Sequence, residues 1–315
     1  MLKLGKVRMI RRRAEGGYFV VFTPKGHNAR VIYRTQFVHV AVGYPGIKML
    51  KDLQEYKVKN RDLSRVVNAY EDHSHIYSTL AQQPGTVLVR GSGIVASRVL
   101  QRLLDQHESG RPLKVVHLFR NYVYGPQKTP STGTRSGKNG FAYQAFNYPK
   151  AAWGGQLKDR LLASSEQTRA DLIKQTGGTN TAPRKSWTDQ LHRCQKQGSY
   201  VQLIGEVKDI HPVEGQGIRT KVEGANGPIS VDADFIIDGT GLEAGVDRDR
   251  LLTDLISSGG ARKNTFGKLQ VTPAFEVEGT GTRLGKVYAS GAMTLEARTL
   301  RSIPSSVCST RPSKS

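Results

Sequence analysis

The sequence is poor in cysteine, in acidic residues and in long apolar runs. Its 315 residues include only Cys194 and Cys308, which form no C-x-x-C pair, so a zinc ribbon and a redox-active dithiol are excluded. The histidines show no H-x-x-x-H spacing, and no metal site is expected. The first residues lack the apolar core of a signal peptide, and no apolar run reaches the length of a membrane span. We therefore expect a cytoplasmic protein.

The scarcity of acidic residues leaves a strongly basic chain. Asp and Glu total 26 against 47 Lys and Arg, which gives a formal net charge of +21 at pH 7. This charge favours contact with nucleic acid, an anionic membrane surface or an acidic protein assembly. No zinc-finger spacing, RNP-type sequence or basic leucine zipper is present, so specific nucleic-acid binding is not expected.

A glycine-rich turn between an apolar run and an amphipathic segment is the most informative motif. Gly91, Gly93 and Ala96 match the dinucleotide-binding pattern G-x-G-x-x-G/A, with Ser92 between the glycines. The apolar residues 87–89 suit a central parallel strand, and 94–104 has helical periodicity. Residues 113–119 read as the next strand, which completes a βαβ unit. The alternative is an α/β domain whose glycine turn binds nothing.

The end of that second strand indicates which cofactor the site prefers. An NAD site usually has Asp or Glu there to bind the ribose hydroxyls, whereas this sequence has Arg120. A cation suits the 2′-phosphate of NADP; the alternative is that Arg120 is a surface residue that ends an edge strand. Arg98, in the first turns of the predicted helix, is a second candidate for the phosphate, with a solvated helix face as the alternative.

Two β-meanders are predicted, at residues 5–43 and 200–231. The first includes, and the second is followed by, a buried strand that ends in small residues, at 37–46 and 233–241 respectively. Helices are predicted at 62–70, 157–175, 187–195 and 251–256, and a last strand at 285–291. Residues 121–155 read as a long basic loop and 301–315 as a disordered basic tail. The fold class expected is α/β, a Rossmann-like parallel sheet with β-meanders.

The order of these motifs resembles the flavoprotein superfamily with two dinucleotide-binding domains, which includes the flavin-containing monooxygenases. Residues 40–45 and 237–241 look like the two turns that close those domains, 89–96 looks like the NADP motif, and 287–292 looks like the last FAD-contacting strand. The absence of paired cysteines favours the monooxygenase branch over the disulfide reductases. The resemblance implies an NADP-binding domain inserted in an FAD-binding domain, with both cofactors bound.

Three departures from the family pattern bear on FAD. Its glycine motif is expected before the first meander, but residues 1–13 contain a single glycine. Ala292 stands where the family usually has an Asp for the flavin ribityl chain, and residues 298–315 replace the usual final helix. The chain is then a fragment, or a partner chain supplies the missing unit, or the FAD site is lost.

The predicted domains are a remnant of an FAD domain at 1–82, an NADP-binding domain at 83–242, a return to the FAD-type domain at 243–300 and a tail at 301–315. Further cofactor contacts are predicted at Gly239, Thr240 and Gly241 through backbone N–H groups, and at Gly291 and Ala292 near a flavin. His73 and His75 are candidates for facing the substrate or the flavin, with a solvated loop as the alternative.

The sequence is compatible with two functions. The first is an NADP(H)-dependent, monooxygenase-like oxidoreductase that transfers hydride from NADPH to a flavin. The second is a non-catalytic, degenerate flavoprotein-like subunit that docks its basic surface into a larger acidic assembly.

Overall fold

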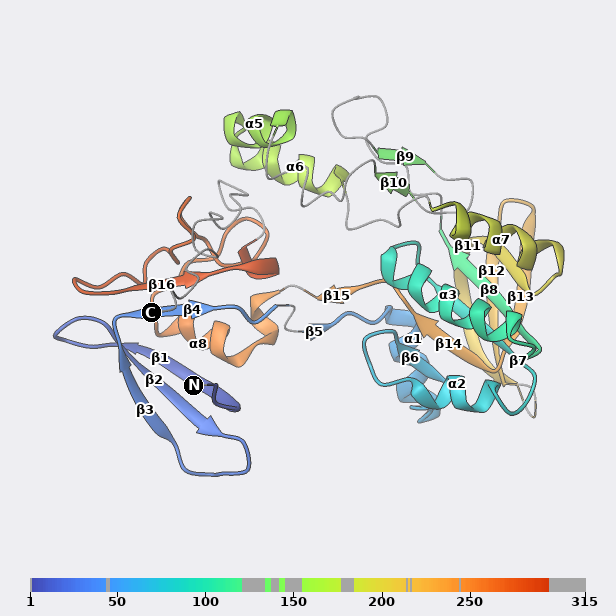
Figure 1. Ribbon diagram of the computed structural model, residues 1–315, viewed down its shortest axis with the longest axis horizontal. Coiled ribbons are helices and arrows are strands. Elements are labelled where there is room, and N and C mark those ends of the chain that lie inside the picture. Colours follow the sequence, from blue (N-terminus) through green and yellow to red (C-terminus); the bar gives the residue numbers. More distant parts are fainter. Residues whose placement is uncertain are drawn as a thin grey trace, which may run out of the picture. The chain divides into compact units, whose positions relative to one another are not determined.

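The computed structural model divides the chain into two compact units (Figure 1). It describes residues 2–43, 46–120, 134–136, 142–144, 155–176, 184–213, 215, 217–243 and 245–294. Unit 1 comprises residues 1–46, 149–175 and 243–315, and unit 2 comprises 47–148 and 176–242. The chain passes between the units after residues 46, 148, 175 and 242. The assignment of the units to two cofactors stays a prediction.

Unit 2 is built on a seven-stranded sheet with the order β13-β12-β11-β8-β7-β14-β6. Five neighbouring strands are parallel: β11 (Tyr200–Val213), β8 (Leu113–Phe119), β7 (Gly85–Arg90), β14 (Phe235–Asp238) and β6 (Val66–Asn68). β12 (Gly217–Gly224) and β13 (Gly227–Ala233) extend the sheet antiparallel beyond β11. The predicted α/β, Rossmann-like parallel sheet with a meander is confirmed.

Alternating side chains on the central strands fill two separate cores. Val87 and Val89 of β7 pack with α2 (Ser74–Leu80), α3 (Ile94–Glu108) and α7 (Lys185–Lys196). Leu88, between them, packs on the other face with α1 (Lys51–Asn60) and with β12 and β13. Both faces of the parallel strands are therefore covered, which explains why these strands read as continuous apolar runs.

The βαβ segment and the helix at 187–195 form where the sequence predicts them, as β7, α3, β8 and α7. Cys194 is buried on α7, and burial raises the pKa of its thiol. The first part of the meander predicted at 200–231 is one long strand, β11, with an irregularity between Val207 and Asp209.

The helix predicted at residues 62–70 is wrong. The Asp62 carboxylate accepts hydrogen bonds from the Arg65 backbone N–H (3.0 Å) and from Arg65 Nε (2.7 Å), a local turn that competes with helix formation. Residues 66–68 then form the buried strand β6 beside β14. The helix of this region lies earlier, at α1, and ends at Arg61, whose φ is +51°.

The single helix predicted at 157–175 is two helices, α5 (Gly155–Ala163) and α6 (Glu166–Thr176). Ser165 Oγ accepts a hydrogen bond from the Thr168 backbone N–H at 3.2 Å. Serine at this position caps a new helix, and the apolar periodicity on either side does not reveal the break.

Unit 1 contains the first meander, the antiparallel sheet β1 (Gly5–Arg12), β2 (Tyr18–Pro24) and β3 (Val31–Thr35). A parallel pair, β4 (Phe37–Val40) and β16 (Lys286–Ala289), shares its core with the meander and with α8 (Arg250–Ser257). Arg11 on β1 forms a double hydrogen bond with Asp254 on α8, 2.6 Å at each oxygen. The predicted helix at 251–256 and the predicted strand at 285–291 are confirmed.

The two units repeat one order of strands. Each meander leads after one residue into a four-residue parallel strand that begins with phenylalanine: β3 into β4 at Phe37, and β13 into β14 at Phe235. β1–β2 and β11–β12 also share a register irregularity at corresponding places. The prediction that these two segments follow the same plan is confirmed.

Several predicted features lie outside the described residues. These are the tail at 301–315, including Cys308, and most of the basic loop at 121–155, apart from the hairpin β9 (Thr134–Ser136) and β10 (Ala142–Gln144). Two short strands, β5 (Gly46–Ile47) and β15 (Leu242–Glu243), pair with each other where the chain passes between the units. Over the described ranges, the helices are too short or too polar to span a bilayer.

Candidate functional site: the carboxyl edge of the parallel sheet

The turn that joins β7 to α3 has the geometry of a phosphate-binding loop. Gly91 has φ +119°, a backbone conformation that residues with a side chain rarely adopt, and Gly93 is the N-cap residue of α3. Gly93 has no side chain with which to cap the start of α3. A Cβ on Gly93 would meet no atom of the described residues within 4 Å, so this side of the turn is open in that part of the structure. The first N–H groups of α3 and its dipole therefore face a space that an anion can enter.

Gly91, Gly239 and Ala96 lie against one another beneath that open side. A Cβ on Gly91 would lie 2.9 Å from the carbonyl carbon and oxygen of Gly239, and a Cβ on Gly239 would lie 3.0 Å from Cα and Cβ of Ala96. Ala96 itself is fully buried. The small residues at these positions thus bring the β7 turn, the β14 turn and α3 into close contact, which is the packing role expected of the third position of the motif.

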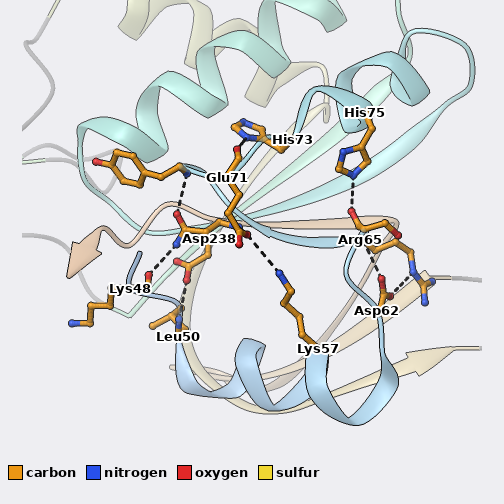
Figure 2. Close-up of polar contacts among 12 residues, drawn as sticks. Lys48, Leu50, Lys57, Asp62, Arg65, Glu71, His73, His75 and Asp238 are labelled. Carbon is orange, nitrogen blue, oxygen red and sulfur yellow. Dashed lines mark hydrogen bonds and ion pairs between the residues drawn. The ribbon is translucent and has the colours of Figure 1, made fainter. Parts of the chain in front are cut away.

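The turn after β14 is held by Asp238, a fully buried carboxylate (Figure 2). It accepts hydrogen bonds from the backbone N–H of Leu50 (2.9 Å) and from the backbone N–H and hydroxyl of Thr240 (2.9 and 2.6 Å). The N–H of Gly239 donates to the Arg90 carbonyl at 2.8 Å. The N–H groups of Gly239 and Thr240 are therefore bonded within the chain, and Gly241, with φ +126° and open space around its Cβ position, is the member of this turn left facing outward.

A second polar network fixes the neighbouring strand end, after β6 (Figure 2). Asn68 is fully buried; its side-chain amide donates to the Lys48 carbonyl (2.9 Å), and its backbone N–H donates to the Glu71 carboxylate (2.9 Å). Lys57 of α1 forms an ion pair with Glu71 at 3.6 Å. Two adjacent strands of the sheet thus end in buried polar groups that orient the following backbone.

Arg120 lies directly after β8, with its side chain exposed, while the preceding Phe119 is buried. The charge of Arg120 also acts on Glu206 of the adjacent strand β11. The pKa of Glu206 is lowered mainly by a hydrogen bond from Lys208, and to a smaller extent by the positive charges of Lys208 and Arg120. Arg98 is exposed on α3, and its Nη1 donates to the Gln101 side chain at 2.9 Å.

His73 and His75 lie near the β6 end of the same unit, and both bond to backbone carbonyls (Figure 2). His73 Nδ1 lies 2.7 Å from the Glu71 carbonyl oxygen and its Nε2 lies 3.1 Å from the Tyr77 hydroxyl. His75 Nε2 lies 2.7 Å from the Ser64 carbonyl oxygen. Within the described ranges no group of three or more His, Cys, Asp or Glu side chains is arranged to hold a metal ion.

The remaining predicted residues belong to unit 1. Gly291 is exposed with φ +86° and begins a 3₁₀ turn, Gly291–Thr294, one residue after the end of β16. Ala292 is half-buried and packs against the core of that unit.

Sequence reasoning missed three buried polar residues that shape the site: Asn68, His117 and Asp238. Their detectable feature is a polar side chain within or at the end of an apolar strand, where an unpaired polar group would be costly. For His117, in the middle of the apolar segment 113–119, that feature is plain in the sequence.

A sheet with five parallel strands and an open glycine turn in one unit, and a meander with a second parallel pair in the other, define an α/β fold. No family model and no curated protein matches the sequence. Solved structures do match, at low sequence identity, and the three below are two monooxygenases and an N-hydroxylase.

Three of these structures illustrate the likeness. The cadaverine monooxygenase DfoA of Erwinia amylovora, bound to FAD, has a TM-score of 0.65 and 14% identity, over 94% of this chain and 63% of its own. The L-lysine 6-monooxygenase of Pseudomonas syringae has a TM-score of 0.64 and 12% identity, over 94% and 67%. The ornithine N-hydroxylase KtzI of Kutzneria sp. 744, with reduced FAD, NADP+ and L-ornithine, has a TM-score of 0.62 and 16% identity, over 94% and 68%. The chain thus spans about two thirds of the length of these proteins.

Proposed function

We propose that unit 2 binds NADP(H) and that the chain works as an NADP(H)-dependent, flavin-linked oxidoreductase of the monooxygenase type in the cytoplasm. The observation that carries the proposal is the open glycine turn at the uncapped start of α3, at the carboxyl edge of a parallel sheet. The fold shared with DfoA and KtzI, whose structures hold FAD or FAD with NADP+, supports the choice of cofactors.

Different residues of unit 2 would contact different parts of the dinucleotide. The pyrophosphate would lie over Gly91, Ser92, Gly93 and Ala96, where backbone N–H groups compensate its charge. Arg120, at the end of the next strand, would bind the 2′-phosphate, and Gly241 lies on the adjoining turn. Bound NADPH supplies a hydride; this chain's residues orient the nucleotide so that its nicotinamide is presented for the transfer.

The described residues of unit 1 fit FAD less well. β16 leads into one exposed glycine, Gly291, but the next residue is the half-buried Ala292 and not an acidic side chain. The described part of this unit also has no parallel strand followed by a glycine turn and a long helix, the arrangement that unit 2 presents at 85–108. The only residues of unit 1 that we assign to the flavin are therefore Gly291 and Ala292.

The absorbance spectrum of the purified protein, with and without added FAD and then with NADPH, tests this proposal. Flavin bands that bleach when NADPH is added support the oxidoreductase. Calorimetry with NADPH alone tests unit 2 separately, and absence of NADPH binding would refute the proposal.

Alanine at position 120 should weaken NADPH binding about tenfold and leave NADH binding unchanged, because it removes one charge-assisted contact to the 2′-phosphate. The matched control is Arg111→Ala, which removes an exposed arginine just before the opposite end of strand β8. Fluorescence titration with both nucleotides measures the effect. An equal loss for NADPH and NADH would show that Arg120 does not read the 2′-phosphate.

A non-catalytic subunit that docks into an acidic assembly is the second candidate. It is favoured by the incomplete fit of unit 1 to FAD and by the charge of residues 1–46, which contain nine Lys and Arg but one acidic residue, Glu15. Failure to bind FAD while NADPH binding is retained would favour this candidate.

A further inference from the structure

The buried histidine of β8 stands directly beneath the glycine turn. His117 is 0% exposed, in a strand whose other residues are apolar except for the exposed Lys114. Burial lowers the pKa of His117 to about 4, although its bond to the Gly91 carbonyl opposes part of that shift, and the ring is neutral at physiological pH. A polar ring in this place is retained only if its nitrogens are bonded.

Both ring nitrogens have partners that together define the tautomer. Nε2 lies 2.6 Å from the Gly91 carbonyl oxygen, and Nδ1 lies 2.9 Å from the Tyr200 hydroxyl on the neighbouring strand β11. Because a carbonyl oxygen only accepts, Nε2 must carry the proton in the neutral ring. Nδ1 then accepts from the Tyr200 hydroxyl, which holds this tautomer in place.

The bond from His117 orients the peptide that links Gly91 to Ser92. The Gly91 N–H donates to the Leu118 carbonyl at 3.1 Å, so both sides of Gly91 are tied to β8. In a trans peptide the N–H points opposite to the C=O, and no cis peptide occurs in the described chain. With the Gly91 carbonyl held toward the His117 ring, the Ser92 N–H must point away from that ring.

We infer that His117 is a positioning residue for the dinucleotide pyrophosphate: through the Gly91 carbonyl it aims the Ser92 N–H at the phosphates, and Tyr200 fixes the tautomer that this requires. The inference rests on the proposed NADP(H) site of unit 2. His117 itself does not touch the nucleotide. Its effect is therefore confined to ligands that carry the pyrophosphate.

The test compares NADPH with 2′-AMP, which carries the 2′-phosphate but no pyrophosphate. His117→Leu should weaken NADPH binding about tenfold, the loss of roughly one aligned donor, and leave 2′-AMP binding unchanged. His117→Gln, which can place an amide N–H near the position of Nε2, should restore NADPH binding to within about threefold of the natural protein. A structural role alone would not separate Leu from Gln in this way, nor NADPH from 2′-AMP.

Tyr200→Phe keeps the test decisive if the leucine variant does not fold. It removes the hydroxyl that fixes the tautomer, and NADPH affinity should fall about threefold with 2′-AMP binding unchanged. If His117→Leu or Tyr200→Phe binds NADPH as the natural protein does, or loses both ligands equally, the inference is overturned while the proposed function stands. If the natural protein binds neither ligand, the proposed function fails and the inference fails with it.

Discussion

Gly93→Ala should weaken NADPH binding about 100-fold and lower the free energy of unfolding of unit 2 by no more than about 1 kcal/mol. Gly93 has φ −85° and ψ −179°, which any residue adopts, and a Cβ there would meet no atom of the described residues within 4 Å. The methyl group would therefore occupy only the space that the proposed site gives to the pyrophosphate. Calorimetric titration with NADPH and urea denaturation measure the two quantities.

Alanine at position 91 is the matched control, since the same change two residues away meets a different environment. Its φ of +119° and the 2.9 Å approach to Gly239 predict a loss of about 2–3 kcal/mol in the free energy of unfolding. If Gly93→Ala instead binds NADPH normally, the open side of the turn does not receive a phosphate.

Acidification from pH 7 to pH 5 should lower the free energy of unfolding of unit 2 by about 2 kcal/mol through His117 alone. Its pKa is about 4 in the folded protein and about 6.5 in the unfolded chain. Between these values the unfolded state binds the extra proton, so stability rises with pH across this window and falls as pH decreases. The ring is fully buried, and solvent screening does not reduce the effect.

Urea denaturation followed by tryptophan fluorescence in a Trp153→Phe background measures this loss, because Trp187 then reports on unit 2 alone. His117→Gln supplies the control, since it keeps the carboxylates and loses the titrating ring. Carboxylates whose pKa values are lowered in the folded protein also reduce its free energy of unfolding on acidification, but mainly at lower pH. Equal pH dependence in the two proteins would mean that His117 is not buried in its neutral form.

The glycine motif and its flanking elements could be predicted because they are local. An apolar run, a turn needing positive φ at Gly91 and a periodic helix each leave a pattern within a few residues. The same locality explains the success at α7 and α8. The sequence also suggested the repeated plan of meander and short strand, which the parallel pairings of β4 with β16 and of β14 with β7 confirm.

The errors lie where tertiary pairing decides the local conformation. Three residues, 66–68, form a strand only because β14 lies beside them, and no three-residue segment has a readable period. The division between α5 and α6 depends on one serine cap. Asp238 and His117 were missed because their roles come from backbone groups of segments distant in sequence, Leu50 and Gly91.

The strand order also has a consequence for synthesis on the ribosome. β14 lies between β6 and β7 but follows them by most of the length of unit 2, and β16 pairs with β4 although the two strands are far apart in sequence. Neither strand set is complete until these later strands emerge. The edges of β7 and β4 therefore remain open until β14 and β16 have been made, so chains that stop before residue 235 should expose strands prone to pairing with other chains.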